Sequence, residues 1–123
     1  MRYMLLCYDD KEAWDKAGEA ALKKAMEEAV QLTHELKAKG QYRSAAPLHP
    51  PATATSVRVR DGKRLVTDGP FAETREHLGG YYLIDAKDLD EAIDIAARHS
   101  GARVGTVEVR HVMELKGLPE DQY

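Results

Sequence analysis

The order of strand-like and helix-like patterns restricts the fold of this chain more than any single motif does. Residues 2–8 form a short, nearly continuous apolar run, which is typical of a central strand buried on both faces. From about residue 10 to 39 apolar positions recur at helical spacing, and Gly40 is a suitable C-terminal stop. Residues 41–46 are strand-like again. The apolar stripe of the predicted helix consists of Leu22, Ala25, Met26, Ala29, Leu32 and Leu36.

A β-hairpin is predicted for Thr55–Asp68, TSVRVRDGKRLVTD, which follows a proline-rich stretch expected to be irregular. Two β-branched runs flank Asp61 and Gly62, a pair that favours a two-residue type I′ turn. Such a turn fixes the pairing of the two strands. The pairs that it predicts are Arg60 with Lys63 and Val57 with Val66.

The second half of the chain repeats the alternation of strand and helix. Residues 80–85 read as a strand, residues 88–99 as a helix that begins with a capping box, and residues 106–113 as a last strand. Without the hairpin the order is βαββαβ, the ferredoxin-like split unit. We therefore predict an α+β fold, a ferredoxin-like βαββαβ unit with an inserted β-hairpin, in one domain that covers residues 1–123.

One face of such a sheet needs a cover. Both helices of the unit lie on the same face, so the other face stays open in a single chain. The strands carry more apolar surface than two helices need, and a second copy packed sheet against sheet supplies the cover. This predicts a homodimer. The residues that suggest the excess are Tyr8, Tyr82, Val107 and Val109.

Composition excludes several classes of protein. Of the 123 residues 43% are hydrophobic and 32% are charged, which suits a globular protein with a core. The net charge of −3 argues against nucleic acid as a partner, and the basic residues that cluster on the hairpin are interpreted as a solvated face. The chain has neither a signal-peptide pattern nor an apolar run of the roughly 20 residues that a membrane span needs. The lone Cys7 excludes an intrachain disulfide and fits a reduced core thiol, so we expect a cytoplasmic protein without a membrane partner.

No cofactor or metal is expected from the motifs. The five histidines show no His-x-x-x-His or clustered carboxylate spacing. The sequence also contains no nucleophile elbow, Walker loop or dinucleotide-binding glycine pattern.

The stretch 50–93, PPATATSVRVRDGKRLVTDGPFAETREHLGGYYLIDAKDLDEAI, resembles the signature of the YCII-related proteins. It is most similar to the DGPF-domain branch, named for the tetrapeptide at residues 68–71. The resemblance implies a ferredoxin-like protomer in a dimeric α+β barrel. The wider group includes a dehydrochlorinase-like enzyme of aromatic degradation and is thought to use a histidine–aspartate pair. Aligned on Gly40, the histidine position falls near Ala29, so this chain lacks that group.

Asp68 is the first catalytic candidate. Alternation along the hairpin places it on the same face as Val57, Val59 and Val66, which would aim its carboxylate toward the apolar interior or a pocket between sheets. There desolvation raises a carboxyl pKa and suits it to general acid–base work. The alternative is a turn in which the Asp68 side chain accepts from backbone N–H groups after Gly69.

His49 is the second catalytic candidate, because neighbouring prolines restrict its backbone and histidine titrates near neutrality. The alternative is an ordinary surface histidine in a loop. Of the other histidines, we expect His77 and His99 to be exposed and His111 to be partly buried.

Five further residues are predicted to line a small-molecule pocket. Pro70 and Phe71 would form its stiff wall, although a core plug is the simpler interpretation. The other three are core, exposed or dimer-contact residues in the simpler interpretation: Tyr8, Tyr81 and Glu76. The pair Gly79-Gly80 indicates a close backbone approach or a bulge.

Two functions follow from these patterns. The first is a cofactor-independent enzyme, a lyase or dehydrochlorinase-like protein that acts on an aromatic or oxo-acid substrate, with proton transfer by Asp68. The second is a non-catalytic module that binds a small molecule or a protein. Proteins that resemble the DGPF branch often accompany extracytoplasmic-function sigma factors, which would suit a sensing role.

Overall fold

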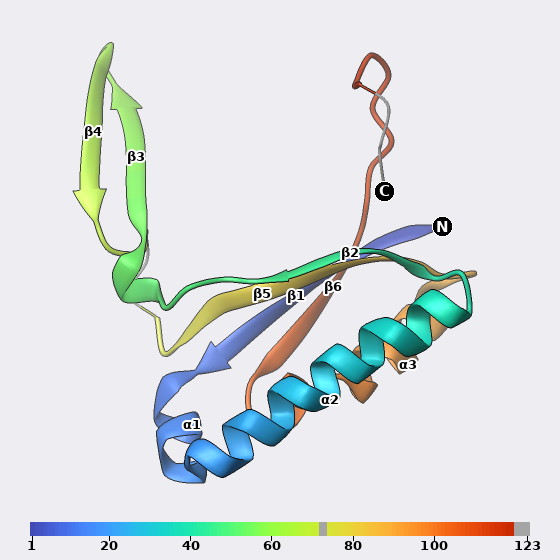
Figure 1. Cartoon of the computed structure of the whole chain (residues 1–123). Helices are drawn as coiled ribbons and strands as arrows, with labels where there is room; N and C mark the ends of the chain where they lie inside the picture. The colour runs from blue at the N-terminus through green and yellow to red at the C-terminus, as the bar shows by residue number, and fades with distance from the viewer. Residues whose placement is uncertain (72–73, 120–123) are drawn as a thin grey trace.

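A computed structural model of the chain describes residues 1–71 and 74–119. Its body has two layers, a four-stranded antiparallel sheet with helices on one face (Figure 1). The strand order β2-β5-β1-β6, with a helix after the first and third of these strands along the chain, confirms the predicted ferredoxin-like α+β fold. The sheet consists of β1 (Arg2–Asp10), β2 (Tyr42–Pro47), β5 (Glu76–Asp85) and β6 (Thr106–His111). The helices are α1 (Lys11–Ala17), α2 (Glu19–Ala38) and α3 (Leu89–Arg98), with 3-10 turns η1 (Pro51–Thr53) and η2 (Ser100–Arg103).

The core lies between the sheet and the helices. The central strand β1 buries every second residue, Tyr3, Leu5 and Cys7, against this layer. Its central position was predicted, but burial of both its faces was not observed: in the single chain the alternate residues are only half-buried. The remaining core residues are Leu32, Leu36, Tyr82, Ile84, Ala86, Ala92, Ile95 and Ala96.

The predicted long helix is two helices. Gly18 separates α1 from α2 with a φ of +92°, a conformation that glycine adopts without strain. The predicted inward stripe was wrong in part: Ala25 is buried, whereas Leu22 and Met26 are 40% and 57% exposed. Leu22, Met26 and Val30 follow one another at intervals of four residues. Each interval rotates the side chain by about 40° around the helix, so these residues turn away from the sheet, and Val30 is also 57% exposed.

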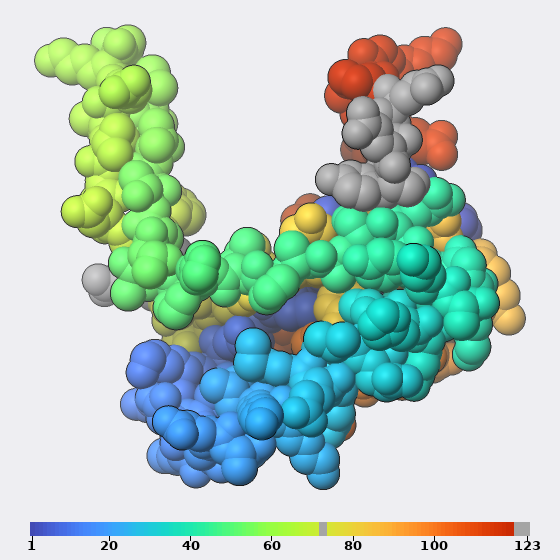
Figure 2. Space-filling model, in the orientation of Figure 1, coloured from blue at the N-terminus to red at the C-terminus, as the bar shows by residue number. Residues whose placement is uncertain are grey.

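The predicted hairpin is present and forms a separate two-stranded sheet of β3 (Thr55–Arg60) and β4 (Lys63–Asp68). Its register confirms the predicted pairs, and positive φ angles at Asp61 (53°) and Gly62 (73°) fit the type I′ turn. We call this hairpin, residues 55–68, the arm. It stands away from the sheet on the side opposite the helices, and with residues 112–119 it flanks an open space (Figures 1 and 2).

Within residues 1–71 and 74–119, no helix or strand covers the sheet surface on that side (Figure 1). Its larger half-buried apolar side chains lie on the two central strands, and we call them the open face: Met4, Leu6, Tyr8, Tyr81 and Leu83. Of the four residues expected to supply excess apolar surface, only Tyr8 lies here. Tyr82 is in the core, and Val107 and Val109 pack against it, because they share the parity of Leu5 and Cys7.

None of the helices in the described ranges combines the length and hydropathy that a membrane crossing requires.

Candidate functional site

Asp68 ends strand β4, opposite Thr55, at the base of the arm. As predicted, the Asp68 side chain lies on the same face of the hairpin as Val57 and Val66. The expectation that this face points into the interior of its own chain was wrong, because Val57 is 61% exposed, Val66 is 56% exposed and Asp68 itself is exposed. The arm stands off the body instead of lying on it. A position between the sheets of two chains stays a prediction.

The turn after Asp68 bears on the alternative role of its carboxylate, which is to accept hydrogen bonds from the backbone N–H groups after Gly69. The N–H of Gly69 donates to the carbonyl of Ala54 at 2.7 Å, and residue 70 is a proline without an N–H. The Ser56 hydroxyl donates to the carbonyl of Gly69 at 2.9 Å. These bonds fix the hairpin base without the Asp68 side chain and leave that carboxylate open to solvent.

Phe71 and Pro70 are exposed, so the interpretation of Phe71 as a core plug was wrong. The Phe71 ring is 75% exposed, and its face lies 4.8 Å from the guanidinium carbon of Arg58 on β3. This cation–π contact ties the segment after the arm to the arm itself. The ring is therefore held in place while most of its apolar surface stays available to a ligand or a second chain.

His49 lies in the loop after β2 and is exposed. The preceding residue is anchored, because the Leu48 N–H donates to the carbonyl of Gly79 at 2.8 Å. Within residues 1–71 and 74–119, His49 shares no hydrogen bond with Asp68, so the two predicted catalytic groups are not joined in the single chain. Their catalytic roles remain predictions.

Tyr8 and Tyr81 lie on the open face, on neighbouring strands. Tyr81 is paired with Leu6, and Tyr8 is paired with Leu78 on β5 and with Thr106 on β6. Both rings are half-buried, so they are neither fully core nor fully solvated. Their role in lining a pocket stays a prediction.

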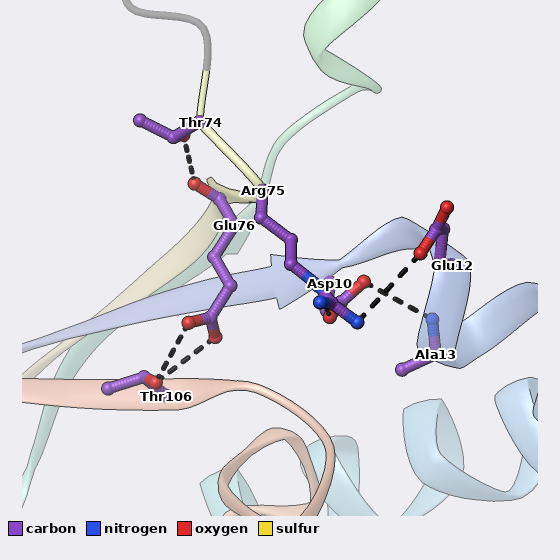
Figure 3. Close-up of polar contacts among 7 residues, drawn as sticks. All are labelled: Asp10, Glu12, Ala13, Thr74, Arg75, Glu76 and Thr106. Atoms are coloured by element: carbon purple, nitrogen blue, oxygen red, sulfur yellow. Dashed lines mark hydrogen bonds and ion pairs between the residues drawn. The ribbon is translucent and has the colours of Figure 1, made fainter.

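Glu76 begins β5, and its carboxylate turns toward β6 (Figure 3). The Thr106 hydroxyl lies 3.0 Å and 3.3 Å from the two Glu76 carboxylate oxygens, and the Thr74 hydroxyl donates to the Glu76 backbone carbonyl. The side chain is half-buried at the end of the sheet where β1, β5 and β6 meet. It belongs to a polar cluster that the sequence patterns did not reveal.

Asp10 is the structural member of that cluster. Its carboxylate caps α1 by accepting from the N–H of Ala13 at 3.2 Å, and it accepts from Nε of Arg75 at 2.9 Å (Figure 3). The hydrogen bond from the Ala13 N–H, followed by that from Arg75, holds the pKa of Asp10 below its usual range. A second ion pair joins Arg75 to Glu12 at 3.8 Å. The segment before β5 is thus fastened to the start of α1.

Asp9 is the chemically distinctive member and was missed. Burial raises the pKa of its carboxyl group, the nearby Glu76 carboxylate raises it further, and a hydrogen bond from Trp14 opposes both. The carboxylate occupies the space above Gly79, where an added Cβ would lie 1.8 Å from Asp9 Oδ2. A carboxyl group whose pKa is raised by burial is a common feature of functional sites. The sequence feature that could have pointed to Asp9 is the pair Gly79-Gly80. The bulge and the close approach predicted for this pair are confirmed.

The other histidines correct the sequence expectations. His111 is exposed and stacks on Tyr3 at 5.0 Å, whereas His77 and His99 are half-buried. His99 Nε2 lies 3.9 Å from the Cys7 sulfur, and burial lowers the His99 pKa. Burial also raises the pKa of the Cys7 thiol to about 12, so Cys7 stays protonated and is a core residue, as predicted.

The helix position expected to carry the histidine of the wider group has only structural contacts. The carbonyl of Ala29 accepts a hydrogen bond from the Tyr82 hydroxyl at 2.9 Å, and its side chain carries no proton-transfer group. Away from this point, α2 bears a shallow groove of about 510 Å³ along its outer side, and the apolar part of its lining is Leu22, Met26 and Val30. None of the predicted site residues lines that groove. Among the described residues, no group of three or more His, Cys, Asp or Glu side chains could hold a metal ion.

The strand order, the two crossover helices and the uncovered sheet face define a ferredoxin-like α+β protein. Comparison with known families gives the assignment: the model of the YCII-related domain matches residues 1–116, and the chain belongs to this family. It is 38% identical over 115 residues to the uncharacterized protein R00369 of Rhizobium meliloti (strain 1021), with 89% of this chain and 90% of that protein covered.

Proposed function

We propose that this YCII-related chain works as a homodimer that binds a small organic molecule between the open faces of two sheets. The observation that supports this most is the open face itself. Its apolar and aromatic residues lie on the two central strands, and no other element of the described part of the chain covers them. A pocket lined by apolar and aromatic side chains with a few polar groups at its edge is the usual form of a small-molecule site.

The polar groups at the edge give the pocket its chemistry. Asp68 and Phe71 lie at the base of the arm, and Glu76 lies where the open face ends, against Thr106, which is paired with Tyr8. In this proposal Asp68 is the acid–base group at the rim, and Tyr8 and Tyr81 line the floor. The substrate class is an aromatic or oxo acid, and the reaction is a proton transfer that needs no cofactor.

A direct test compares binding and turnover across a panel of aromatic and hydroxymuconate-type acids. Binding is followed by calorimetry and turnover by chromatography of the products. Asp68→Asn keeps the size and polarity of the side chain, so binding should stay within about threefold while turnover falls by about 10²–10⁴. Asp61→Asn is the matched control, because this aspartate occupies the tip of the same arm and asparagine suits its turn position.

A second candidate, a non-catalytic sensing module, is favoured by one observation: the position of the group's helix histidine holds Ala29, whose side chain has no proton-transfer group. The same panel separates the two. Binding without turnover in the unaltered protein supports the module, and such a protein would suit an accessory of an extracytoplasmic-function sigma factor. Turnover that Asp68→Asn leaves unchanged would remove Asp68 from the mechanism.

A further inference from the structure

Among the described residues, the two strands of the arm contact mainly each other. One side of it, which we call the valine face, consists of Val57, Val59 and Val66, and these are 61%, 60% and 56% exposed. Leu65 on the other side is 47% exposed. A two-stranded hairpin on its own is at best marginally stable in water. Exposed β-branched residues on both strands therefore indicate a surface that another molecule covers.

The direction and length of the arm indicate where that molecule lies. The arm rises on the side of the open face, away from the helices (Figure 1). Each of its strands has six residues and so extends for about 20 Å, whereas two sheets packed face to face lie about 10 Å apart. When two open faces meet, an arm of this length runs past the sheet of the other chain and along its side.

The charges of the arm and the body are complementary. Residues 55–68 contain four basic and two acidic side chains, a formal charge of +2 in a chain of net −3, so the rest of the chain carries −5. The basic residues are Arg58, Arg60, Lys63 and Arg64. An arm placed against the body of a second copy brings opposite net charges together, which favours association over repulsion.

We propose that the arm is a clasp whose valine face packs on the body of a second copy of this chain. This inference rests on the homodimer proposed above and adds to it a contact of each arm with the other subunit. It has a consequence for the pocket: Asp68 and Phe71, at the base of the arm, lie where the two subunits meet. The arm of one subunit thus helps to close the pocket of the pair.

Cross-linking tests the clasp without altering the protein. Lys63 is the only lysine of the arm, and a zero-length carbodiimide reagent joins its amine to a carboxylate in contact with it. Dimers assembled from equal amounts of ¹⁴N- and ¹⁵N-labelled chains show by mass spectrometry whether a cross-linked peptide pair comes from one chain or two. We expect pairs of mixed isotopes from Lys63 to body carboxylates. Lys63 links found only within single-isotope pairs would overturn the clasp.

A pair of variants tests the packing. Val66→Lys places a charge on the valine face, and Val30→Lys makes the same change on the outer side of α2, where the residue has nearly the same exposure (56% and 57%). In sedimentation velocity over a concentration series, Val66→Lys should weaken dimerisation at least tenfold and Val30→Lys by less than about twofold. Circular dichroism checks that both variants fold.

The outcomes separate the clasp from the dimer. An unaltered protein that stays monomeric at all concentrations removes both. An unaltered dimer in which Val66→Lys associates as tightly as Val30→Lys removes the clasp and keeps the dimer. Weakened association of Val66→Lys together with mixed-isotope links from Lys63 supports the clasp.

Discussion

Two adjacent aspartates, Asp9 and Asp10, have opposite electrostatic environments. Burial and the Glu76 carboxylate raise the Asp9 pKa, whereas the Ala13 N–H and Arg75 lower the Asp10 pKa. A raised carboxyl pKa means that the folded state binds the proton more tightly than the unfolded state. The stability from Asp9 is therefore present at low pH and is lost as the pH rises from about 3.9 through the raised folded value. The stability that Asp10 contributes is present above the unfolded-state pKa of about 3.9 and is lost as the pH falls through the lowered pKa of the folded state.

Neutral amides at these two positions should therefore change the midpoint of thermal unfolding in opposite directions. At pH 7 we expect Asp9→Asn to raise Tm, since it removes a disfavoured charge and its amide oxygen still accepts from Trp14. Asp10→Asn should lower Tm, since it keeps a capping side chain but loses the ion pair with Arg75. Calorimetry at pH 7 and near pH 3 measures both, and the two differences from the unaltered protein should shrink at the lower pH. A lower Tm for Asp9→Asn at pH 7 would contradict this description of Asp9.

Two glycines near this cluster lie against atoms of different mobility. An added Cβ at Gly105 would lie 2.1 Å from the backbone carbonyl oxygen of Tyr8, whereas at Gly79 it would lie 1.8 Å from the Asp9 side chain. The backbone carbonyl of Tyr8, on the central strand β1, cannot turn away, but the carboxylate of Asp9 can. We expect Gly105→Ala to lower the free energy of unfolding by about 3 kcal/mol and Gly79→Ala by about 1 kcal/mol. Urea denaturation measures both, and combining Gly79→Ala with Asp9→Ala should remove most of the smaller loss.

At the scale of secondary-structure elements, the sequence was informative where local chemistry decides the structure. The arm, its register and its turn follow from Asp61-Gly62 and the β-branched runs beside it, and all were predicted. What could not be predicted was how elements meet: the direction of the arm, the outward turn of Leu22 and Met26, and the seat of Asp9 above Gly79. These depend on contacts between residues far apart in sequence, which periodicity does not encode.

The arm and the body should differ in local stability. The arm has backbone pairing but few buried apolar contacts, whereas β1 and β5 border the core. Hydrogen exchange of a dilute sample should therefore show arm amides opening at much lower free energy than those of β1. Raising the protein concentration should protect the arm if it packs on a second copy. Arm amides as well protected as those of β1 in a demonstrated monomer would contradict this difference.

One side-chain hydrogen bond connects the sheet to the middle of α2. The Tyr82 hydroxyl donates to the carbonyl of Ala29 at 2.9 Å, and burial raises the pKa of that hydroxyl. Tyr82→Phe removes this bond and keeps the ring in the core. We expect a loss of about 1 kcal/mol in the free energy of unfolding by urea. Because burial raises the pKa of this hydroxyl above its ordinary value of about 10, the loss should not vary between pH 6 and pH 9.

At the scale of the whole molecule, the proposed dimer would make assembly part of stability. The fold class was predicted because six strand and helix patterns in this order leave few topologies, and the uncovered face follows from the same topology. The candidate site was predicted only in part, because a pocket between two chains depends on surfaces that no single-chain pattern describes. A dimer held by these surfaces makes unfolding a bimolecular equilibrium, in which the midpoint depends on protein concentration.

A tenfold rise in concentration then adds about 1.4 kcal/mol to the stability of the dimer. For a dimer of this size the shift in Tm is roughly 3–5 °C. Leu83→Lys, which places a charge in the middle of the open face, should abolish that shift, whereas Met26→Lys on the outer side of α2 should retain it. Calorimetric scans over a hundredfold range of concentration measure all three proteins. A constant Tm of the unaltered protein over that range would mean that the open face is exposed to solvent in a monomer. The proposed pocket between two sheets would then not exist.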